Sequence, residues 1–212
     1  RGHNNPDSPA ASLRTHRDTR IAAGESPERR RMRLTTDRLT IRRFEADDWR
    51  DLHDYLSQPE VVEHEPYDVF SEEQARQEAI GRAADPAFWA VESRSEAKVI
   101  GNVWLGEGGQ DTRELGYVFN ARYWGNGFAA EACRALIEWA FAQGTHRIVA
   151  ECNPLNQASW RLLERLGFRR EGHLVENVYF RRDDDGHPMW QDTYVYAVLA
   201  SEWDDVADST SS

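Results

Sequence analysis

The sequence predicts an α+β protein built around a mixed β-sheet. Two observations lead to this prediction. Apolar segments with the character of strands follow one another across short polar or glycine-rich turns, as in hairpins, and amphipathic segments interrupt them irregularly. The expected order of elements is β-α-α-β-β-β-α-β-α-β-β, which lacks the regular repeat of a doubly wound parallel sheet. The 212 residues suffice for one domain with a full core.

Seven segments carry the strand signal. Polar turns join 88–92 to 98–107 and 173–180 to 191–199, so each pair is expected to form a hairpin. Segment 146–152 contains the run Ile-Val-Ala and is interpreted as a buried strand. The predicted strands are residues 39–44, 88–92, 98–107, 114–120, 146–152, 173–180 and 191–199.

Four amphipathic segments predict helices between these strands. Either Asp47 or Asp48 is expected to cap the first helix, and a proline that follows residue 58 is expected to end it. The last two helices are expected to end at Gly144 and Gly167. The predicted helices are residues 49–56, a stretch that begins at the capping box of Ser71, residues 129–141 and residues 157–166.

Charge is distributed unevenly along the chain. The net charge is -11, yet residues 1–33 contain eight arginines and four acidic residues. We predict that residues 1–33 form a mobile basic tail, that residues 34–205 form the folded domain, and that residues 206–212 form a disordered C-terminal tail. The acidic body argues against nucleic acid as the main ligand; it would suit a cationic partner such as an amine, or it serves solubility alone.

The remaining composition bears on compartment and cofactor class. No apolar run approaches about 18 residues, so no membrane span is expected, and the first residues lack the apolar segment of a secretory signal. Cys133 and Cys152 do not form a C-x-x-C pair and are interpreted as buried thiols of a cytoplasmic protein. The histidines lack ligand spacing, and no metal site is predicted.

A glycine turn lies between the strand at 114–120 and the helix at 129–141. Its sequence is RYWGNGFAAEA, beginning at Arg122. Glycines let backbone N–H groups converge on phosphate oxygens, and the N-terminus of the following helix adds a favourable dipole. Neither Lys-Ser nor Lys-Thr follows, which argues against a nucleotide-triphosphate loop.

Two anions fit the spacing of this loop. The stretch from Gly125 to Ala130 matches the dinucleotide fingerprint G-x-G-x-x-A, and Glu151 could then bind a ribose. The stretch from Arg122 to Gly127 matches [QR]-x-x-G-x-[GA], a pattern suited to the pyrophosphate of coenzyme A. Several residues separate the strand from the first glycine, and hairpins surround the loop, which favours coenzyme A.

With this loop in view, the chain resembles the GNAT N-acetyltransferase superfamily, and within it the RimJ/RimL-like branch. The resemblance covers about residues 34–203 and rests on TDRLTIRRF, GNVWLGE, ELGYVFNARYWGNGFAAEA and NPLNQASWRLLERLGFRREG. It implies a strongly twisted mixed sheet, splayed between the fourth and fifth strands, with acetyl-CoA in the splay. It also implies acetyl transfer to a primary amine, either the N-terminal α-amine of a peptide or protein, including ribosomal proteins, or a small amine such as an antibiotic or polyamine. Enzymes of this kind are often homodimers.

The resemblance also implies which residues hold the cofactor. The main chain of the fourth strand is expected to pair with the pantetheine arm, and the glycine loop to bind the pyrophosphate. Two asparagines after the fifth strand are expected to contact the pantetheine amides, although Asn156 could instead serve only as a helix cap. The expected cofactor-binding residues are Tyr117, Val118, Phe119, Arg122, Trp124, Gly125, Asn126, Gly127, Phe128, Ala129, Asn153, Asn156 and Ser159.

Three side chains are candidates for proton transfer. Many GNAT enzymes place a tyrosine acid seven residues after the asparagine, where this chain has Leu163, so Ser159 or a water is expected to protonate the departing thiolate. The Ser159 hydroxyl could instead bond a carbonyl of its own helix. Glu114, which opens the fourth strand, and Glu176, on the sixth, are candidate bases for the attacking amine, with a water relay as the alternative.

Two rival functions stay open on the sequence alone. The first is an enzyme that uses a nicotinamide dinucleotide bound at the glycine loop. The second is a non-catalytic module that keeps the GNAT fold and binds coenzyme A, which the missing tyrosine makes worth testing.

Overall fold

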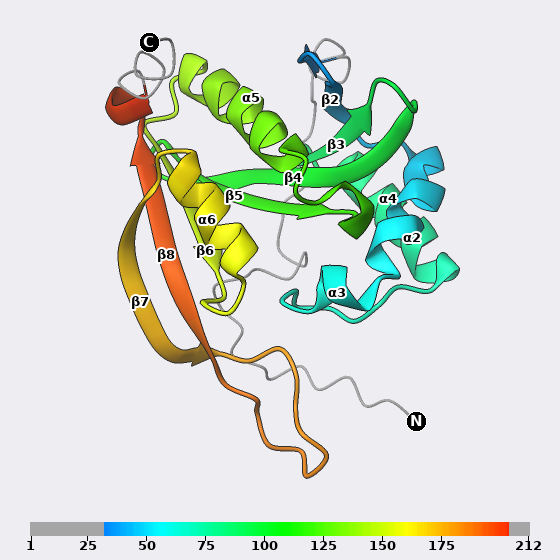
Figure 1. Cartoon of the computed structure of the whole chain (residues 1–212), viewed down its shortest axis with the longest axis vertical. Coiled ribbons are helices and arrows are strands. Elements are labelled where there is room, and N and C mark those ends of the chain that lie inside the picture. The colour runs from blue at the N-terminus through cyan, green and yellow to red at the C-terminus, as the bar shows by residue number, and fades with distance from the viewer. Residues whose placement is uncertain (1–31, 204–212) are drawn as a thin grey trace.

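The computed structural model describes residues 32–203, which form one eight-stranded sheet with the strand order β1-β2-β3-β4-β5-β6-β8-β7. Neighbouring strands are antiparallel except β5 and β6, which run parallel. Figure 1 shows α5 and α6 against the sheet, α2, α3 and α4 gathered to one side, and β7 and β8 as a long hairpin at the sheet's edge. The prediction of an α+β fold with a mixed sheet is confirmed.

The elements agree closely with the predicted ones. The strands are β1 (Arg33–Thr35), β2 (Leu39–Arg43), β3 (Phe88–Ser93), β4 (Lys98–Gly109), β5 (Thr112–Phe119), β6 (Arg147–Cys152), β7 (Arg169–Val178) and β8 (Gln191–Leu199). The helices are α2 (Trp49–Leu56), α3 (Pro59–Val62), α4 (Glu72–Ala84), α5 (Phe128–Ala142) and α6 (Gln157–Arg165), with short 3-10 turns η1 (Ala46–Asp48) and η2 (Ala121–Tyr123).

Besides the two 3-10 turns, one strand and one α-helix were not predicted. The strand β1 is only three residues long, so it carries too little alternation to be seen in the sequence. The proline expected to end the first helix is the first residue of α3. Proline suits that position because its missing N–H has no partner in the first turn of a helix.

Two hydrophobic clusters cover opposite faces of the sheet. One joins α5 and α6 to β2–β6 and β8, and it contains Leu115 and Phe119 of β5. The other joins α2, α3 and α4 to β3, β4 and β5, and it contains Val118. Because successive side chains of a strand alternate between faces, β5 presents Glu114, Gly116 and Val118 to the side of α2–α4.

The ladder between β5 and β6 is short. Thr112, Arg113 and Glu114 pair with Arg147, Ile148 and Val149. Beyond these three pairs, β5 continues to Phe119 and β6 to Cys152 without pairing to each other. The sheet is therefore splayed between the fourth and fifth predicted strands, as the resemblance implied.

Asp48 stands at the N-cap position of α2, but its side chain does not cap that helix. The guanidinium of Arg42 donates two hydrogen bonds of 2.8 Å to Asp48, and its Nε donates to Glu92 at 2.8 Å. Asp48 also accepts the N–H of Glu45 at 2.8 Å. A nearly buried guanidinium requires charged partners, so the carboxylate ties β2 to the helical layer.

Several predictions concern segments at the margins of the described chain. The tails predicted for residues 1–33 and 206–212 lie outside it, except that Met32 and Arg33 are included. Within residues 32–203, no helix combines the length and apolarity that a membrane crossing requires. Cys133 is buried as expected, whereas Cys152 is only half-buried.

Candidate functional site

The glycine loop has the backbone conformation that an anion cradle needs. Gly125 has a φ of 75° and Gly127 a φ of 79°, in the left-handed region that side chains disfavour. Gly127 is also the N-cap of α5. The side chain of Asn126 donates to the carbonyl of Trp124 at 3.0 Å and thereby closes the turn.

The amides of this loop are available to a ligand. Among the described residues, none accepts a hydrogen bond from the N–H groups of residues 125–130. A Cβ placed on Gly125 would have no atom within 4 Å, so the loop is open on that side. Free N–H groups at a helix N-terminus suit a phosphate group, so these residues fit the pyrophosphate of coenzyme A.

The predicted side chains around the loop take different positions. Arg122 is exposed, and Trp124 is 49% exposed while its Nε1 donates to the carbonyl of Phe119 at 2.8 Å. Phe128 is half-buried and packs edge-on against Tyr123. The loop is thus anchored to the end of β5 through Trp124 and to the core through Phe128, while Arg122 is exposed.

The side chain of Tyr117 contacts Ser159 across the splay. Its hydroxyl lies 2.9 Å from the Ser159 hydroxyl and 3.0 Å from the Ser159 carbonyl. Burial raises the pKa of Tyr117, and the hydrogen bond with Ser159 opposes this shift. Burial also raises the pKa of Cys152 to about 12, against a hydrogen bond from Ser159. A thiol with that pKa stays protonated near neutral pH, so Cys152 is not a ready nucleophile.

The two asparagines expected to meet the pantetheine amides already make local hydrogen bonds. The side-chain oxygen of Asn156 accepts the N–H of Ser159 at 3.1 Å, so Asn156 caps α6. Asn153 accepts the N–H of Leu155 and donates to the side chain of Gln191, both at 2.8 Å. The helix-cap role of Asn156 is confirmed, while its contact with a cofactor stays a prediction.

Glu114 and Glu151 form a carboxylate pair on the sheet face opposite α5 and α6. Glu114 pairs in register with Val149, and Glu151 is two residues further along β6 on the same face. Partial burial raises the pKa of Glu151, and the charge of Glu114 raises it further. From the sequence Glu151 was considered only as a ribose ligand, because its face depends on how β5 pairs with β6.

Trp104 borders this carboxylate pair. In the ladder of β4 and β5, Trp104 pairs with Gly116 and Gly106 pairs with Glu114. The indole covers Gly106, where a Cβ would come within 2.2 Å of the ring. The glycine at 106 therefore makes room for the ring beside Glu114. An aromatic face next to carboxylates suits a cationic amine.

The structure places Glu176 away from Glu114. Strands β6 and β8 lie between β5 and β7, which corresponds to about 14 Å across three strand spacings. Glu176 is exposed, has a φ of 46°, and its N–H donates to Asp192 at 2.8 Å. It sits where the register shifts between Leu174 and Val178. The two carboxylates proposed from the sequence are therefore not brought together.

One arginine joins two loops on the same side of the sheet as the carboxylate pair. Arg181, after β7, donates to the carbonyls of Glu63, Val62 and Tyr67, all between 3.0 and 3.2 Å, and pairs with Asp68 at 3.2 Å. A cavity of about 660 Å³ lies against this junction, lined by Pro59, Glu60, Val62, Glu63, Asp68, Val69 and Arg181. The loop after β7 is thereby tied to the loop after α3.

The loop after α3 also holds an unusual carboxylate. Burial raises the pKa of Glu65 to about 7, although a hydrogen bond with Tyr67 and the charge of Arg82 oppose the shift. Its charge therefore changes near neutral pH.

Among the described residues, no group of three or more His, Cys, Asp or Glu side chains is arranged to hold a metal ion.

The topology differs from that of a dinucleotide-binding fold. Within residues 32–203, only one pair of adjacent strands is parallel, whereas the dinucleotide hypothesis requires successive parallel strands linked by helices. Glu151, the proposed ribose ligand of that reading, lies beside Glu114. The glycine loop therefore belongs to a different kind of site.

Comparison with known proteins agrees with this geometry. Residues 38–169 match the family described as an acetyltransferase (GNAT) domain. The chain is 38% identical over 175 residues to the uncharacterized N-acetyltransferase YnaD of Bacillus subtilis (strain 168), covering 81% of this chain and 99% of that protein. It is 30% identical over 188 residues to the ribosomal protein uS5-alanine N-acetyltransferase of Escherichia coli (strain K12), covering 82% and 93% respectively.

A solved structure shows the same fold. The crystal structure of a GNAT-family acetyltransferase from Bacillus anthracis superposes with a TM-score of 0.73 at 34% identity, covering 81% of this chain and 100% of that one. The match to a ribosomal-protein alanine acetyltransferase is consistent with the RimJ/RimL-like branch. With the splayed sheet, the glycine loop and these relatives together, the chain belongs to the GNAT acetyltransferase family and is an acyltransferase.

Proposed function

We propose that this protein transfers the acetyl group of acetyl-CoA to the N-terminal α-amine of a peptide or protein. The splay between β5 and β6 carries the proposal. It leaves edges of β5 and β6 that do not pair with each other beside the glycine loop, and the half-buried Glu114–Glu151 pair lies on the opposite face. Donor and acceptor can therefore approach one gap from two sides.

The fit of the site to coenzyme A supports the choice of donor. Acetyl-CoA supplies a thioester whose carbonyl accepts the amine and whose thiolate departs. The amides of residues 125–130 would bind its phosphates, and the free edge of β5 beyond Glu114 would hold its pantetheine arm by main-chain hydrogen bonds. A main-chain N–H on that edge would also stabilise the oxyanion that forms.

Glu151 is the base that the geometry favours. An attacking amine must be neutral, so a carboxylate has to accept the proton of the ammonium group. A raised pKa makes Glu151 a stronger base, and Glu114 contributes to it. Glu176 stays a second candidate, which would require the acceptor to approach along β7.

Ser159 and Tyr117 are the candidates for protonating the thiolate. Leu163 holds the position of the usual tyrosine, while the Tyr117 hydroxyl reaches the Ser159 hydroxyl at 2.9 Å from β5. Ser159 would give its proton to the thiolate and regain one from Tyr117, which in turn recovers a proton from solvent, so the two hydroxyls serve as one donor. A tyrosine on strand β5 would then replace the one missing from helix α6.

The acceptor class follows from the surface around the carboxylate pair. Trp104, Glu114 and Glu151 suit a protonated amine, and the relative that acts on ribosomal protein uS5 favours a protein N-terminus. A small amine such as a polyamine or an antibiotic is the second candidate, since the same acidic face attracts it. A cytoplasmic location and a homodimer stay predictions.

A panel of acceptors tests this proposal. The release of free thiol from acetyl-CoA would be followed with peptides that begin with Ala, Ser or Thr, with the same peptides blocked at the N-terminus, and with polyamines and aminoglycosides. The proposal expects turnover with free peptides and none with blocked ones. Turnover with small amines alone would refute the peptide assignment, and no turnover with any acceptor would refute both.

A further inference from the structure

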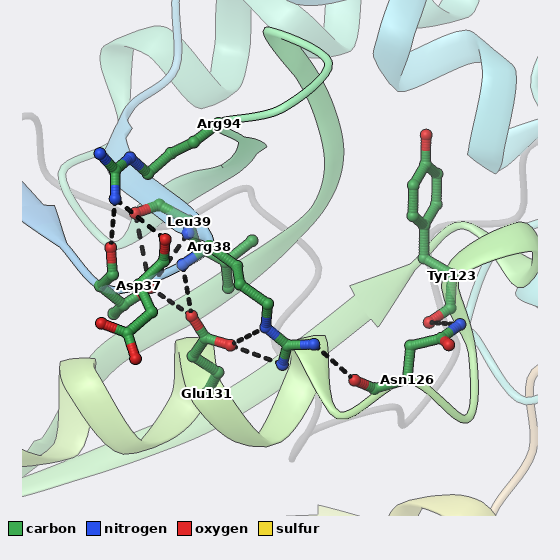
Figure 2. A network of polar contacts seen from close by, with 8 residues as sticks. Asp37, Arg38, Leu39, Arg94, Tyr123, Asn126 and Glu131 are labelled. Atoms are coloured by element: carbon green, nitrogen blue, oxygen red, sulfur yellow. Dashed lines mark hydrogen bonds and ion pairs between the residues drawn. The ribbon is translucent and has the colours of Figure 1, made fainter.

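Arg38 contacts the glycine loop and α5 at three points. Its Nη1 donates to the carbonyl of Asn126 at 2.9 Å, and its Nε and Nη2 each lie 2.6 Å from a carboxylate oxygen of Glu131. The guanidinium also lies 4.3 Å from the centre of the Phe128 ring. Figure 2 shows the guanidinium between the Glu131 carboxylate on the helix and the loop at Asn126.

From these contacts we propose that Arg38 is a positioning residue that holds the glycine loop in its anion-binding conformation. The inference rests on the proposed use of acetyl-CoA. Since the Asn126 carbonyl is turned toward Arg38, the neighbouring N–H groups are left to face the ligand. Arg38 thus acts through the loop, because all three of its guanidinium nitrogens already have partners.

The charge of Glu131 gives a second reason for the arginine. Glu131 lies in the first turn of α5, whose N-terminus would bind the anion. Partial burial raises its pKa, but hydrogen bonds from Thr36 and Arg38 outweigh this and hold the pKa below its usual value. An ionised carboxylate near a phosphate is repulsive, and the Arg38 charge neutralises it.

The turn that carries Arg38 is itself fixed. Thr36 donates to Glu131 at 2.5 Å, and the backbone N–H of Arg38 donates to the same carboxylate at 3.1 Å. Arg94 donates to the carbonyls of Thr36 and Asp37, both at 2.9 Å, from the opposite side of the turn. The β1–β2 turn therefore forms a rigid base that transmits its position to the glycine loop.

The test measures coenzyme A binding by calorimetry in the whole chain. Arg38→Ala is expected to raise the Kd for coenzyme A about tenfold, since a loop that is no longer preorganised must be ordered on binding. Arg38→Lys is expected to lose nearly as much, because one ammonium cannot bridge the carboxylate and the carbonyl. Arg76→Ala, which removes a partly exposed arginine of α4 whose ion pairs are with acidic residues of its own helix, is the matched control and should bind as the wild type does.

Two further measurements separate the outcomes. In Arg38→Ala combined with Glu131→Gln, part of the lost affinity should return because the unpaired charge is gone. Pantetheine, which lacks the diphosphate, should bind Arg38→Ala and wild type alike. Full affinity in Arg38→Lys, or equal losses for pantetheine and coenzyme A, would overturn the inference. If the wild type itself binds no coenzyme A, the proposed function fails instead.

Discussion

The hydroxyls of Tyr117 and Ser159 lie 2.9 Å apart and join β5 to α6 across the splay. If this pair protonates the thiolate, Ser159→Ala and Tyr117→Phe should each lower kcat by about tenfold to a hundredfold with little change in KM. Steady-state kinetics at saturating donor would measure this.

The matched control for that experiment is Ser93→Ala. Ser93 is a buried serine at the end of β3, and its hydroxyl lies 3.1 Å from the hydroxyl of Ser95. The substitution Ser93→Ala removes a comparable hydroxyl and should leave kcat unchanged. Unchanged kcat in Ser159→Ala and Tyr117→Phe would instead assign the proton to a water.

The acid limb of the pH–rate profile should respond to Glu114. Burial first and the charge of Glu114 second raise the pKa of Glu151. In Glu114→Gln the repulsion is gone, the pKa falls, and the base is ionised at lower pH. The acid limb of kcat/KM should therefore shift to lower pH, as rates measured across pH 4–9 would show.

Glu151→Gln should abolish that limb and most of the activity. Glu176→Gln is the comparison variant, because Glu176 lies on the outer strand of the sheet. If Glu176→Gln removes the limb while Glu151→Gln keeps it, the base is Glu176 and the acceptor approaches along β7.

Two glycines with the same backbone conformation allow the effect of a substitution on stability to be distinguished from its effect on cofactor binding. Gly125 and Gly109 both have a φ of 75°, and at neither would a Cβ meet an atom within 4 Å. Alanine at either position should cost about 1 kcal/mol of unfolding free energy through backbone strain. Only Gly125→Ala should also raise the KM for acetyl-CoA, by about tenfold, because only Gly125 lies in the cradle. Equal KM values in both variants would contradict the cradle.

Glu171 should stabilise the fold in a defined range of pH. Ion pairs with Arg147 and Arg169 lower the pKa of Glu171 to about 2. An unfolded glutamate titrates near pH ~4.3, so the contribution is complete above about pH 5 and is lost as the pH falls through about 2.

Glu171→Gln should therefore lower the free energy of unfolding by about 1 kcal/mol at pH 7, a value set by the partly exposed position of the pair. The deficit should vanish near pH 2 in urea titrations followed by circular dichroism. Glu107→Gln, at an ion pair of 4.0 Å whose carboxylate is 88% exposed, should change nothing at either pH. A deficit that persists at low pH would point to lost packing.

Most helices and strands could be predicted from the sequence, because the patterns that indicate them are local. Residues 49–56 and 129–141 carry helical periodicity, and the capping box at Ser71 is present as predicted. The splay came from the resemblance and is confirmed by the short β5–β6 ladder. The strand β1 and helix α3 were missed, since three or four residues give no period to read.

The candidate site was legible only where it is local. The glycine loop can be recognised in the sequence from the spacing of its residues, but the partners of those residues come from distant parts of the chain. Arg38 reaches Glu131 across 93 positions, and Tyr117 reaches Ser159 across 42. Likewise, the position of Glu151 beside Glu114 depends on strand order. Such contacts are set by the order in which the strands pair, and no local sequence pattern specifies that order.

Because the ladder between β5 and β6 is short, the stability of the fold should depend on the concentration of the ligand. Three residue pairs hold the two halves of the sheet by few hydrogen bonds, and the shared core under α5 and α6 holds the rest. A ligand that pairs with the free edges binds the folded chain alone, and at 100-fold excess over its Kd it would add about 2.7 kcal/mol to the unfolding free energy. The melting temperature would then depend on the concentration of acetyl-CoA. When acetyl-CoA is scarce, the amide hydrogens along the junction of β5 and β6 would exchange first.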